Sequence, residues 1–136
     1  MLESTIEQIL NKDAITGKLF LGCFASNELP IKPKYPSCFV VNTKPRNHPG
    51  EHWVAFNYSS NGSCFFFDSY AQNPAKYNFE TYIKNTATSC HSIKNIYKDS
   101  QIFVDTIAYS TYCLLQEKKL KHFSRNFPQT ILKMTI

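Results

Sequence analysis

The chain has 136 residues and a net charge of +5, and 43% of its residues are apolar, so we expect one domain over residues 1–136 with a substantial core. It contains no run of eighteen apolar residues, which argues against a transmembrane helix. It does not begin with a basic region followed by an apolar one, which argues against a signal peptide. We therefore expect an intracellular protein without membrane contact. Five cysteines at irregular positions, with no C-x-x-C pair, argue against a disulfide scaffold and a zinc site, so no metal is expected.

A short helix and two extended segments are predicted in the first part of the chain. Ser4-Thr5-Ile6-Glu7 has the pattern of a capping box, and the apolar residues after it recur at helical spacing, which predicts a helix ending between Asn11 and Asp13. Leu19–Phe24 is an apolar extended segment. After a proline-rich loop, Ser37–Asn42 has the composition of a strand.

The next two strands form a predicted β-hairpin. Residues His52–Tyr58 and Ser63–Asp68 are rich in aromatic and β-branched side chains. Ser59-Ser60-Asn61-Gly62 between them is a turn, with Asn-Gly as its strongest signal.

The hairpin brings two chemically active side chains together. Pairing Tyr58 with Ser63 places His52 opposite Ser69 and next to Asp68, at a cross-strand distance of about 5 Å. An imidazole base with an orienting carboxylate is half of a nucleophilic active site.

The rest of the chain is predicted to alternate helices and a strand. These elements are a weak helix over Asn78–Asn85, a strand over Ser92–Tyr97, a helix from Asp105 or Thr106 to about Lys119, and a last helix over Pro128–Met134. His48 and His91 fall in predicted loops and receive no role. The element order predicts a single α+β domain.

The positive charge is concentrated near one helix end, at Lys118, Lys119, Lys121 and Arg125. Such a cluster can follow nucleic-acid phosphates. A solvated helix C-terminus, where the helix dipole favours lysine, is the preferred interpretation.

A His–Asp pair needs a nucleophile, and a catalytic thiol works best at a helix N-terminus, where its pKa is lowered. The helix that begins near Asp105 is the place to look. Gln101 precedes it and could stabilise an oxyanion.

Several ordered stretches resemble the adenovirus-type cysteine proteases (adenain). They are Phe20-Leu21-Gly22-Cys23-Phe24-Ala25-Ser26-Asn27-Glu28-Leu29-Pro30, Val40-Val41-Asn42-Thr43, Pro49-Gly50-Glu51-His52-Trp53-Val54-Ala55, Phe67-Asp68-Ser69-Tyr70 and Tyr112-Cys113-Leu114. The version encoded by Polinton/Maverick transposons, adintoviruses and virophages is the most similar. SUMO and ubiquitin-like proteases share the His-Trp, Asp, Gln, Cys order.

The resemblance implies a papain-like α+β fold of the adenain type, with a mixed central sheet and the helix of the nucleophile packed against it. It implies that His52 is the general base, Asp68 its orienting acid and Gln101 the oxyanion donor, with Trp53 packed against the site as a substrate-binding residue. It also implies maturation cleavage of viral precursor and capsid proteins, in the host cytoplasm, the nucleus or the virion.

The predicted position of the nucleophile holds no cysteine. In adenain-like enzymes a Cys followed by Gly lies seven residues after the Gln, and here that position is Ala108, followed by Tyr109 in the substrate-binding position. Three explanations stay open: a deliberate replacement of the cysteine, a natural loss, or a register shift that uses Cys113. Tyr109 in place of Gly counts against simple replacement.

Three other functions are kept as alternatives. The chain could be a silent relative that binds a peptide or a virion protein, or an isopeptidase for a ubiquitin-like modifier. It could also bind nucleic acid through its basic cluster. Adenain needs no cofactor for its chemistry but is assisted by DNA and a short peptide, which makes both candidate activators here.

Overall fold

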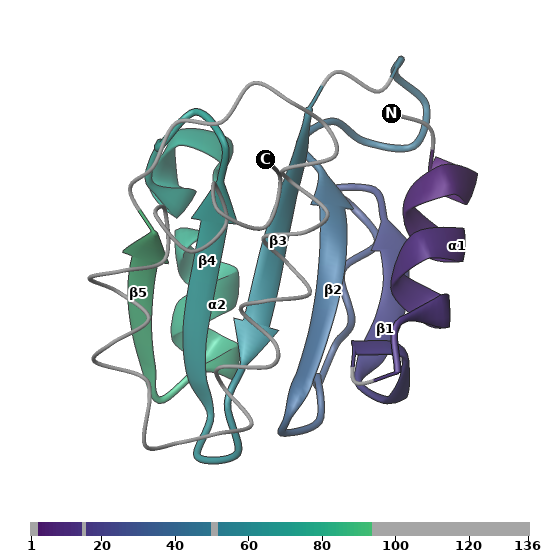
Figure 1. Cartoon of the computed structure of the whole chain (residues 1–136). Coiled ribbons are helices and arrows are strands. Elements are labelled where there is room, and N and C mark those ends of the chain that lie inside the picture. The colour runs from purple at the N-terminus through teal and green to yellow at the C-terminus, as the bar shows by residue number, and fades with distance from the viewer. Residues whose placement is uncertain (1–2, 15, 50–51, 94–136) are drawn as a thin grey trace.

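The computed structural model describes residues 3–14, 16–49 and 52–93, and these form a mixed five-stranded sheet with two α-helices, as expected for an α+β fold (Figure 1). The strands lie in the order β1-β2-β3-β4-β5, with β1–β2 and β4–β5 parallel and the two central pairings antiparallel. The elements are α1 Glu3–Lys12, η1 Thr16–Lys18, β1 Phe20–Phe24, β2 Ser37–Asn42, β3 Trp53–Tyr58, β4 Ser63–Asp68, η2 Pro74–Tyr77, α2 Glu80–Thr86 and β5 Ser89–Ile93.

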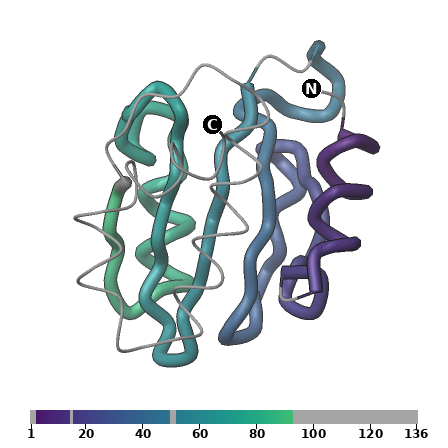
Figure 2. The backbone as a smooth tube through the Cα atoms, in the orientation of Figure 1, coloured from purple at the N-terminus to yellow at the C-terminus, as the bar shows by residue number. Residues whose placement is uncertain are grey.

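Each helix packs on a different part of the sheet. The backbone trace shows α1 beside β1 at one edge, and α2 against one face near β4 and β5 (Figure 2). Ile6 and Leu10, on one side of α1, are fully buried, which confirms the predicted amphipathic helix.

The core on the α2 face is largely aromatic. It consists of Phe39, Val41, Val54, Phe56, Tyr58, Cys64, Phe66, Phe79 and Ile83. Phe39 and Phe56 stack with ring centroids 5.0 Å apart, and Phe79 meets Phe56 edge-on at 5.4 Å. Full burial of one such side chain is worth about 1.5–3 kcal/mol, so this cluster fixes α2 on the sheet.

The hairpin register differs by one residue from the sequence prediction. Val54 pairs with Asp68 and Tyr58 with Cys64, so Tyr58 does not pair with Ser63. The Ser59 N–H donates to the Ser63 carbonyl at 2.9 Å, which leaves a shorter loop that ends at Gly62 with φ +88°. A glycine with positive φ at the end of a three-residue loop shifts the pairing in this way.

Two later elements begin elsewhere than predicted. The sequence placed a helix at Asn78–Asn85, and α2 begins at Glu80 because Asn78 takes a left-handed φ of 64° after η2. The strand predicted at Ser92–Tyr97 begins at Ser89, because pairing with β4 runs from Ser63–Ser89 to Phe67–Ile93. His91 therefore lies in a strand, where its ring stacks on Phe65 at 4.9 Å.

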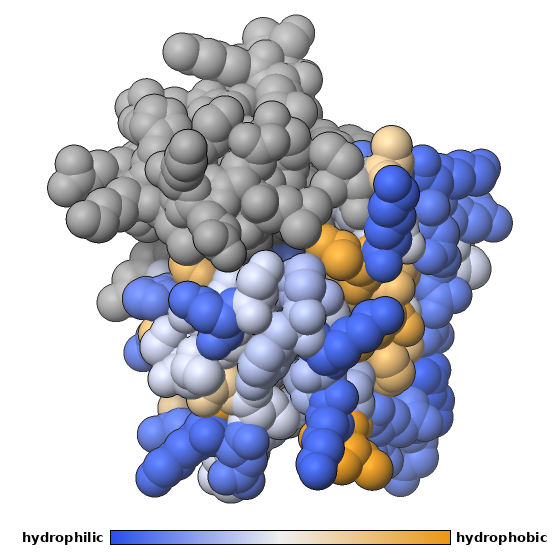
Figure 3. Space-filling model, turned by 90° about the horizontal axis from the view of Figure 1, so that it is seen from below, coloured by the Kyte–Doolittle hydropathy of each residue, from blue (hydrophilic) through white to orange (hydrophobic). Residues whose placement is uncertain are grey.

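The end of the sheet that carries the hairpin turn is mainly polar. Viewed from below, its apolar residues form small patches between hydrophilic ones (Figure 3). Among the described residues, no helix has both the length and the apolar character needed to cross a bilayer.

Candidate active site

His52 and Asp68 are hydrogen-bonded at the opposite end of the hairpin from its turn. His52 Nε2 lies 2.5 Å from Asp68 Oδ1. Val54 is directly opposite Asp68, and His52 lies two residues before Val54, so all three side chains belong to one face of the sheet. The observed register, with Asp68 opposite Val54, is what puts the two polar groups on the same face.

Backbone pairing extends just beyond β3 and fixes His52. The Thr43 N–H donates to the His52 carbonyl at 2.9 Å, in continuation of the β2–β3 ladder. The His52 side chain is 13% exposed, so its imidazole is largely but not completely buried.

The Asp68 carboxylate is fully buried and accepts four hydrogen bonds. Besides His52, Oδ1 accepts the Tyr70 N–H at 3.0 Å. Oδ2 accepts the Gln72 N–H at 3.2 Å and the Tyr77 hydroxyl at 2.6 Å. Burial raises the pKa of Asp68, but the hydrogen bonds from His52, Tyr77 and the Tyr70 N–H outweigh it and hold this pKa below its ordinary value.

A tight turn after β4 builds this environment. Asp68 accepts backbone N–H groups two and four residues ahead, as short polar side chains do in turns, and the Ala71 N–H closes the turn on the Asp68 carbonyl at 2.8 Å. To form this turn, Ala71 takes a φ of 57°, a backbone conformation that is unfavourable for a residue with a Cβ.

Two tyrosines complete the pair's surroundings, and the sequence interpretation missed both. Tyr70 stacks on the His52 ring with centroids 4.1 Å apart and planes 13° from parallel. Tyr77 lies 6.0 Å from the same ring and donates to Asp68. Burial and the neighbouring Asp68 carboxylate raise the pKa of Tyr77, so its hydroxyl remains a proton donor.

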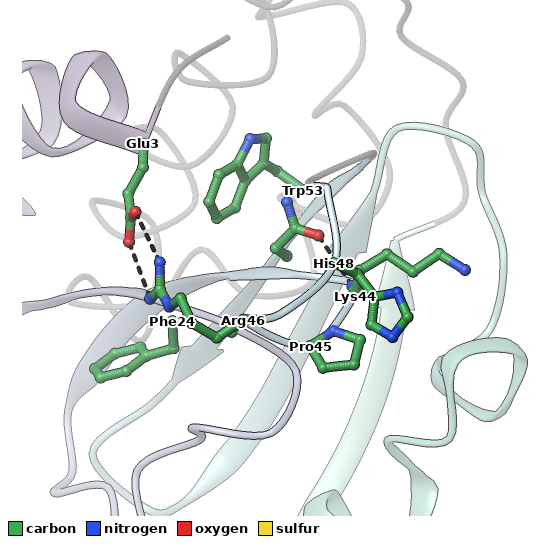
Figure 4. A pocket seen from close by; sticks show the side chains of 9 residues that line it. Glu3, Phe24, Lys44, Pro45, Arg46, His48 and Trp53 are labelled. Atoms are coloured by element: carbon green, nitrogen blue, oxygen red, sulfur yellow. Dashed lines mark hydrogen bonds and ion pairs between the residues drawn. The ribbon is translucent and has the colours of Figure 1, made fainter.

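Trp53 leaves the other face of β3 and lines a separate pocket. This hollow of about 190 Å³ is formed by Glu3, Phe24, Ala25, Asn42, Lys44, Pro45, Arg46, His48 and Trp53 (Figure 4). It combines two aromatic side chains with charged groups of both signs. The pocket is close to His52 in the sequence, because Trp53, which lines the pocket, is the residue directly after His52.

Arg46 fixes the wall of this pocket. Its guanidinium lies 3.1 Å from Glu3 of α1 and 2.8 Å from Glu28 in the loop after β1. The hydrogen bonds that the guanidinium donates to these two carboxylates, chiefly to Glu3, raise the pKa of Arg46, and its backbone N–H donates to Asn27 Oδ1 at 3.1 Å. The loop that leads toward His52 is thereby tied to α1.

The remaining predicted site residues lie outside the described residues. They are Gln101, Ala108, Tyr109 and the basic residues Lys118, Lys119, Lys121 and Arg125. Within residues 3–14, 16–49 and 52–93, no group of three or more His, Cys, Asp and Glu side chains is arranged to hold a metal ion.

The geometry suits proton transfer by His52. When the neutral imidazole donates its Nε2–H to Asp68, Nδ1 is the basic nitrogen. That nitrogen can take a proton from a thiol or hydroxyl placed within hydrogen-bonding distance, and the Asp68 carboxylate stabilises the resulting imidazolium.

Comparison with known proteins gives a family match over the part of the chain that contains His52 and Asp68. The sequence model of the adenovirus endoprotease family matches residues 20–96. The protease of human adenovirus E serotype 4 is 36% identical over 62 residues, which are 43% of this chain and 30% of the relative. The protease of human adenovirus B serotype 3 is also 36% identical over 62 residues, 43% of this chain and 29% of the relative. The match therefore spans less than a third of each relative's length.

Proposed function

Because the chain belongs to the adenovirus endoprotease family, we propose that it has the architecture of a cysteine endopeptidase that processes viral precursor and capsid proteins. The observation that carries the proposal is the 2.5 Å contact between His52 Nε2 and the buried Asp68 carboxylate. The two adenovirus relatives named as proteases support it. The proposal includes a papain-like arrangement of the adenain type, a viral or transposon origin near the Polinton/Maverick enzymes, and action inside a host cell or virion.

In the proposed reaction, His52 removes the proton of a thiol carried at position 108. The thiolate attacks the peptide carbonyl carbon, the amine departs with the proton from the imidazolium, and water then releases the acid from the acyl-enzyme. Asp68 holds the imidazole in the reactive tautomer, and Gln101 donates to the oxyanion. This chemistry requires no cofactor.

This chain has Ala108 at that position, so we propose that it binds polypeptide without cleaving it. The pocket lined by Trp53 and Arg46 is the proposed place for a substrate side chain, and Tyr109 is the proposed neighbour of the scissile bond. An aromatic wall with both a cation and a carboxylate can hold an apolar side chain and orient polar groups around it.

The test compares the unmodified chain with Ala108→Cys and with Ala108→Cys combined with His52→Ala. Each protein is treated with iodoacetamide at pH 6, and alkylation of every thiol is followed by peptide mass spectrometry. Next to His52, the introduced thiol should be alkylated more than tenfold faster than in the His52→Ala background, because a neighbouring imidazolium favours the thiolate. Cys23 is an internal control, since burial and the nearby Glu7 and Glu3 raise its pKa to about 12.

Equal alkylation rates with and without His52 would contradict the assignment of position 108. Peptidase activity toward viral precursor peptides should appear only with Ala108→Cys. Activity of the unmodified chain would instead indicate that Cys113 is the nucleophile. A ubiquitin-like probe that captured the introduced thiol, without cleavage of viral peptides, would replace the endopeptidase proposal with isopeptidase activity.

A further inference from the structure

Two cysteines face each other across neighbouring strands, away from the His52 site. Cys64 of β4 and Cys90 of β5 are register partners in the parallel pair, so their side chains are neighbours on one face of the sheet. Adjacent strands lie about 4.8 Å apart, which is within the Cα separation that a disulfide can span. Within the described part of the chain, neither Cys64 nor Cys90 takes part in a disulfide.

The two thiols lie in contrasting environments. Cys64 is fully buried in the aromatic core, whereas Cys90 is exposed. Cys90 also lines a pocket of about 560 Å³ formed by Asn73, Pro74, Ala75, Glu80, Ile83, Lys84 and Cys90. This hollow, between η2, α2 and β5, gives a small molecule direct access to one thiol of the pair.

The two neighbouring thiols differ in acidity. Interaction with the Cys64 thiol lowers the pKa of Cys90, whereas interaction with the Cys90 thiol, together with burial, raises the pKa of Cys64. The thiolate is the species that attacks a disulfide, so the accessible member of the pair is also the more reactive one.

We propose that Cys90 is a modification site for low-molecular-weight disulfides such as oxidised glutathione, and that Cys64 resolves the adduct to a Cys64–Cys90 disulfide. The Cys90 thiolate attacks one sulfur of the small disulfide, whose S–S bond breaks and releases one thiolate. Cys64 then loses its proton and attacks Cys90 Sγ, which releases the second thiolate. Two protein thiols are oxidised, and one small disulfide is reduced to two thiols.

This cross-link would close a loop that contains the carboxylate half of the candidate site. The segment between Cys64 and Cys90 contains Asp68, Tyr70 and Tyr77. Closing it covalently restricts the unfolded chain, so the oxidised protein should melt at a higher temperature than the reduced protein. The chemistry does not depend on peptidase activity.

The other described cysteines lack this arrangement. Cys23 and Cys38 are buried, and their sheet neighbours Val40 and Asn57 are not cysteines. They serve as internal controls.

The experiment places the reduced full chain in non-denaturing buffers with graded ratios of reduced and oxidised glutathione. After acid quench and blocking of free thiols, intact mass and non-reducing peptide mapping should reveal a species lighter by two hydrogens, with the peptides of Cys64 and Cys90 joined. Cys64→Ala should accumulate a glutathione adduct on Cys90, Cys90→Ser should leave Cys64 unmodified, and Cys23→Ser should oxidise as the unmodified chain does.

Circular dichroism on each sample establishes that the reacting protein is folded. Absence of the joined peptides at every glutathione ratio would overturn the proposal, and so would a disulfide that links Cys90 to another cysteine. Because this measurement uses the unmodified chain, it decides the question even if Cys64→Ala does not fold.

Discussion

The buried Asp68 carboxylate holds His52 Nε2 at 2.5 Å because the hairpin register and the turn after β4 act together. The register puts both side chains on one face of the sheet. The turn then supplies Tyr70 and Gln72 N–H groups, so the carboxylate is oriented by the backbone as well as by the imidazole. A carboxylate held this way is an orienting group that stays ionised.

Tyr77→Phe should destabilise the protein by about 2 kcal/mol, the magnitude typical of a hydrogen bond to a charged group. The change removes only the hydroxyl that donates to Asp68 Oδ2 at 2.6 Å. Urea unfolding at neutral pH measures the loss. Tyr82→Phe is the matched control, since its hydroxyl donates to the neutral Pro30 carbonyl and should cost less. Equal losses of stability in the two variants would mean that the hydrogen bond from Tyr77 to the charged Asp68 contributes no more than a bond to a neutral carbonyl.

Asp68→Asn should destabilise the protein by about 3 kcal/mol at pH 7, because it removes the buried charge and replaces one of two carboxylate oxygens, each of which accepts two hydrogen bonds, with an NH2 group that cannot accept. The folded-state pKa of Asp68 is lowered, so its ionisation stabilises the fold above its unfolded value of about 3.9. That stability is lost as the pH falls from this value through the lower folded pKa. Unfolding curves between neutral and acidic pH should therefore show the two proteins converging below about pH 4. A gap that does not change with pH would mean that Asp68 is already protonated in the folded protein.

Strand positions could be predicted from sequence because they depend on local composition. β2 and β4 have the predicted bounds, since each is a short apolar run between turn residues. β5 begins three residues before the predicted start because Ser89, Cys90 and His91 have no strong strand propensity, and their pairing with β4 determines where the strand begins.

The site was only partly predictable for a related reason. His52 and Asp68 lie at the ends of recognisable strands. Tyr70 and Tyr77 come from a turn and a short 3-10 helix, which have no apolar periodicity to reveal them. Their positions follow from hydrogen bonds and ring contacts around Asp68 and His52 that exist only in the folded chain.

Ala71→Gly should stabilise the protein by about 0.5–1 kcal/mol. Ala71 has a φ of 57°, where a Cβ is unfavourable, and glycine relieves that strain at a smaller entropic cost. The denaturant midpoint at constant slope is the measurement. Ala75→Gly, in η2 without a positive φ, should instead be destabilising. If both substitutions lowered the midpoint, the turn after Asp68 would not be strained at Ala71.

Gly62→Ala should destabilise the hairpin by about 1–3 kcal/mol, the range for a strained backbone position. Gly62 has a φ of 88°, and a Cβ there would lie 2.6 Å from Tyr35 Cε2. Tyr35 has little freedom to yield, because its ring stacks on Tyr58 at 5.8 Å and its hydroxyl donates to the Thr86 carbonyl. Repeating the substitution in a Tyr35→Ala background separates the two causes: the clash disappears, whereas the backbone strain remains. A smaller cost in that background is expected. An unchanged cost would assign the whole effect to the positive φ, and no cost in either background would contradict the three-residue loop that sets the register of His52 and Asp68.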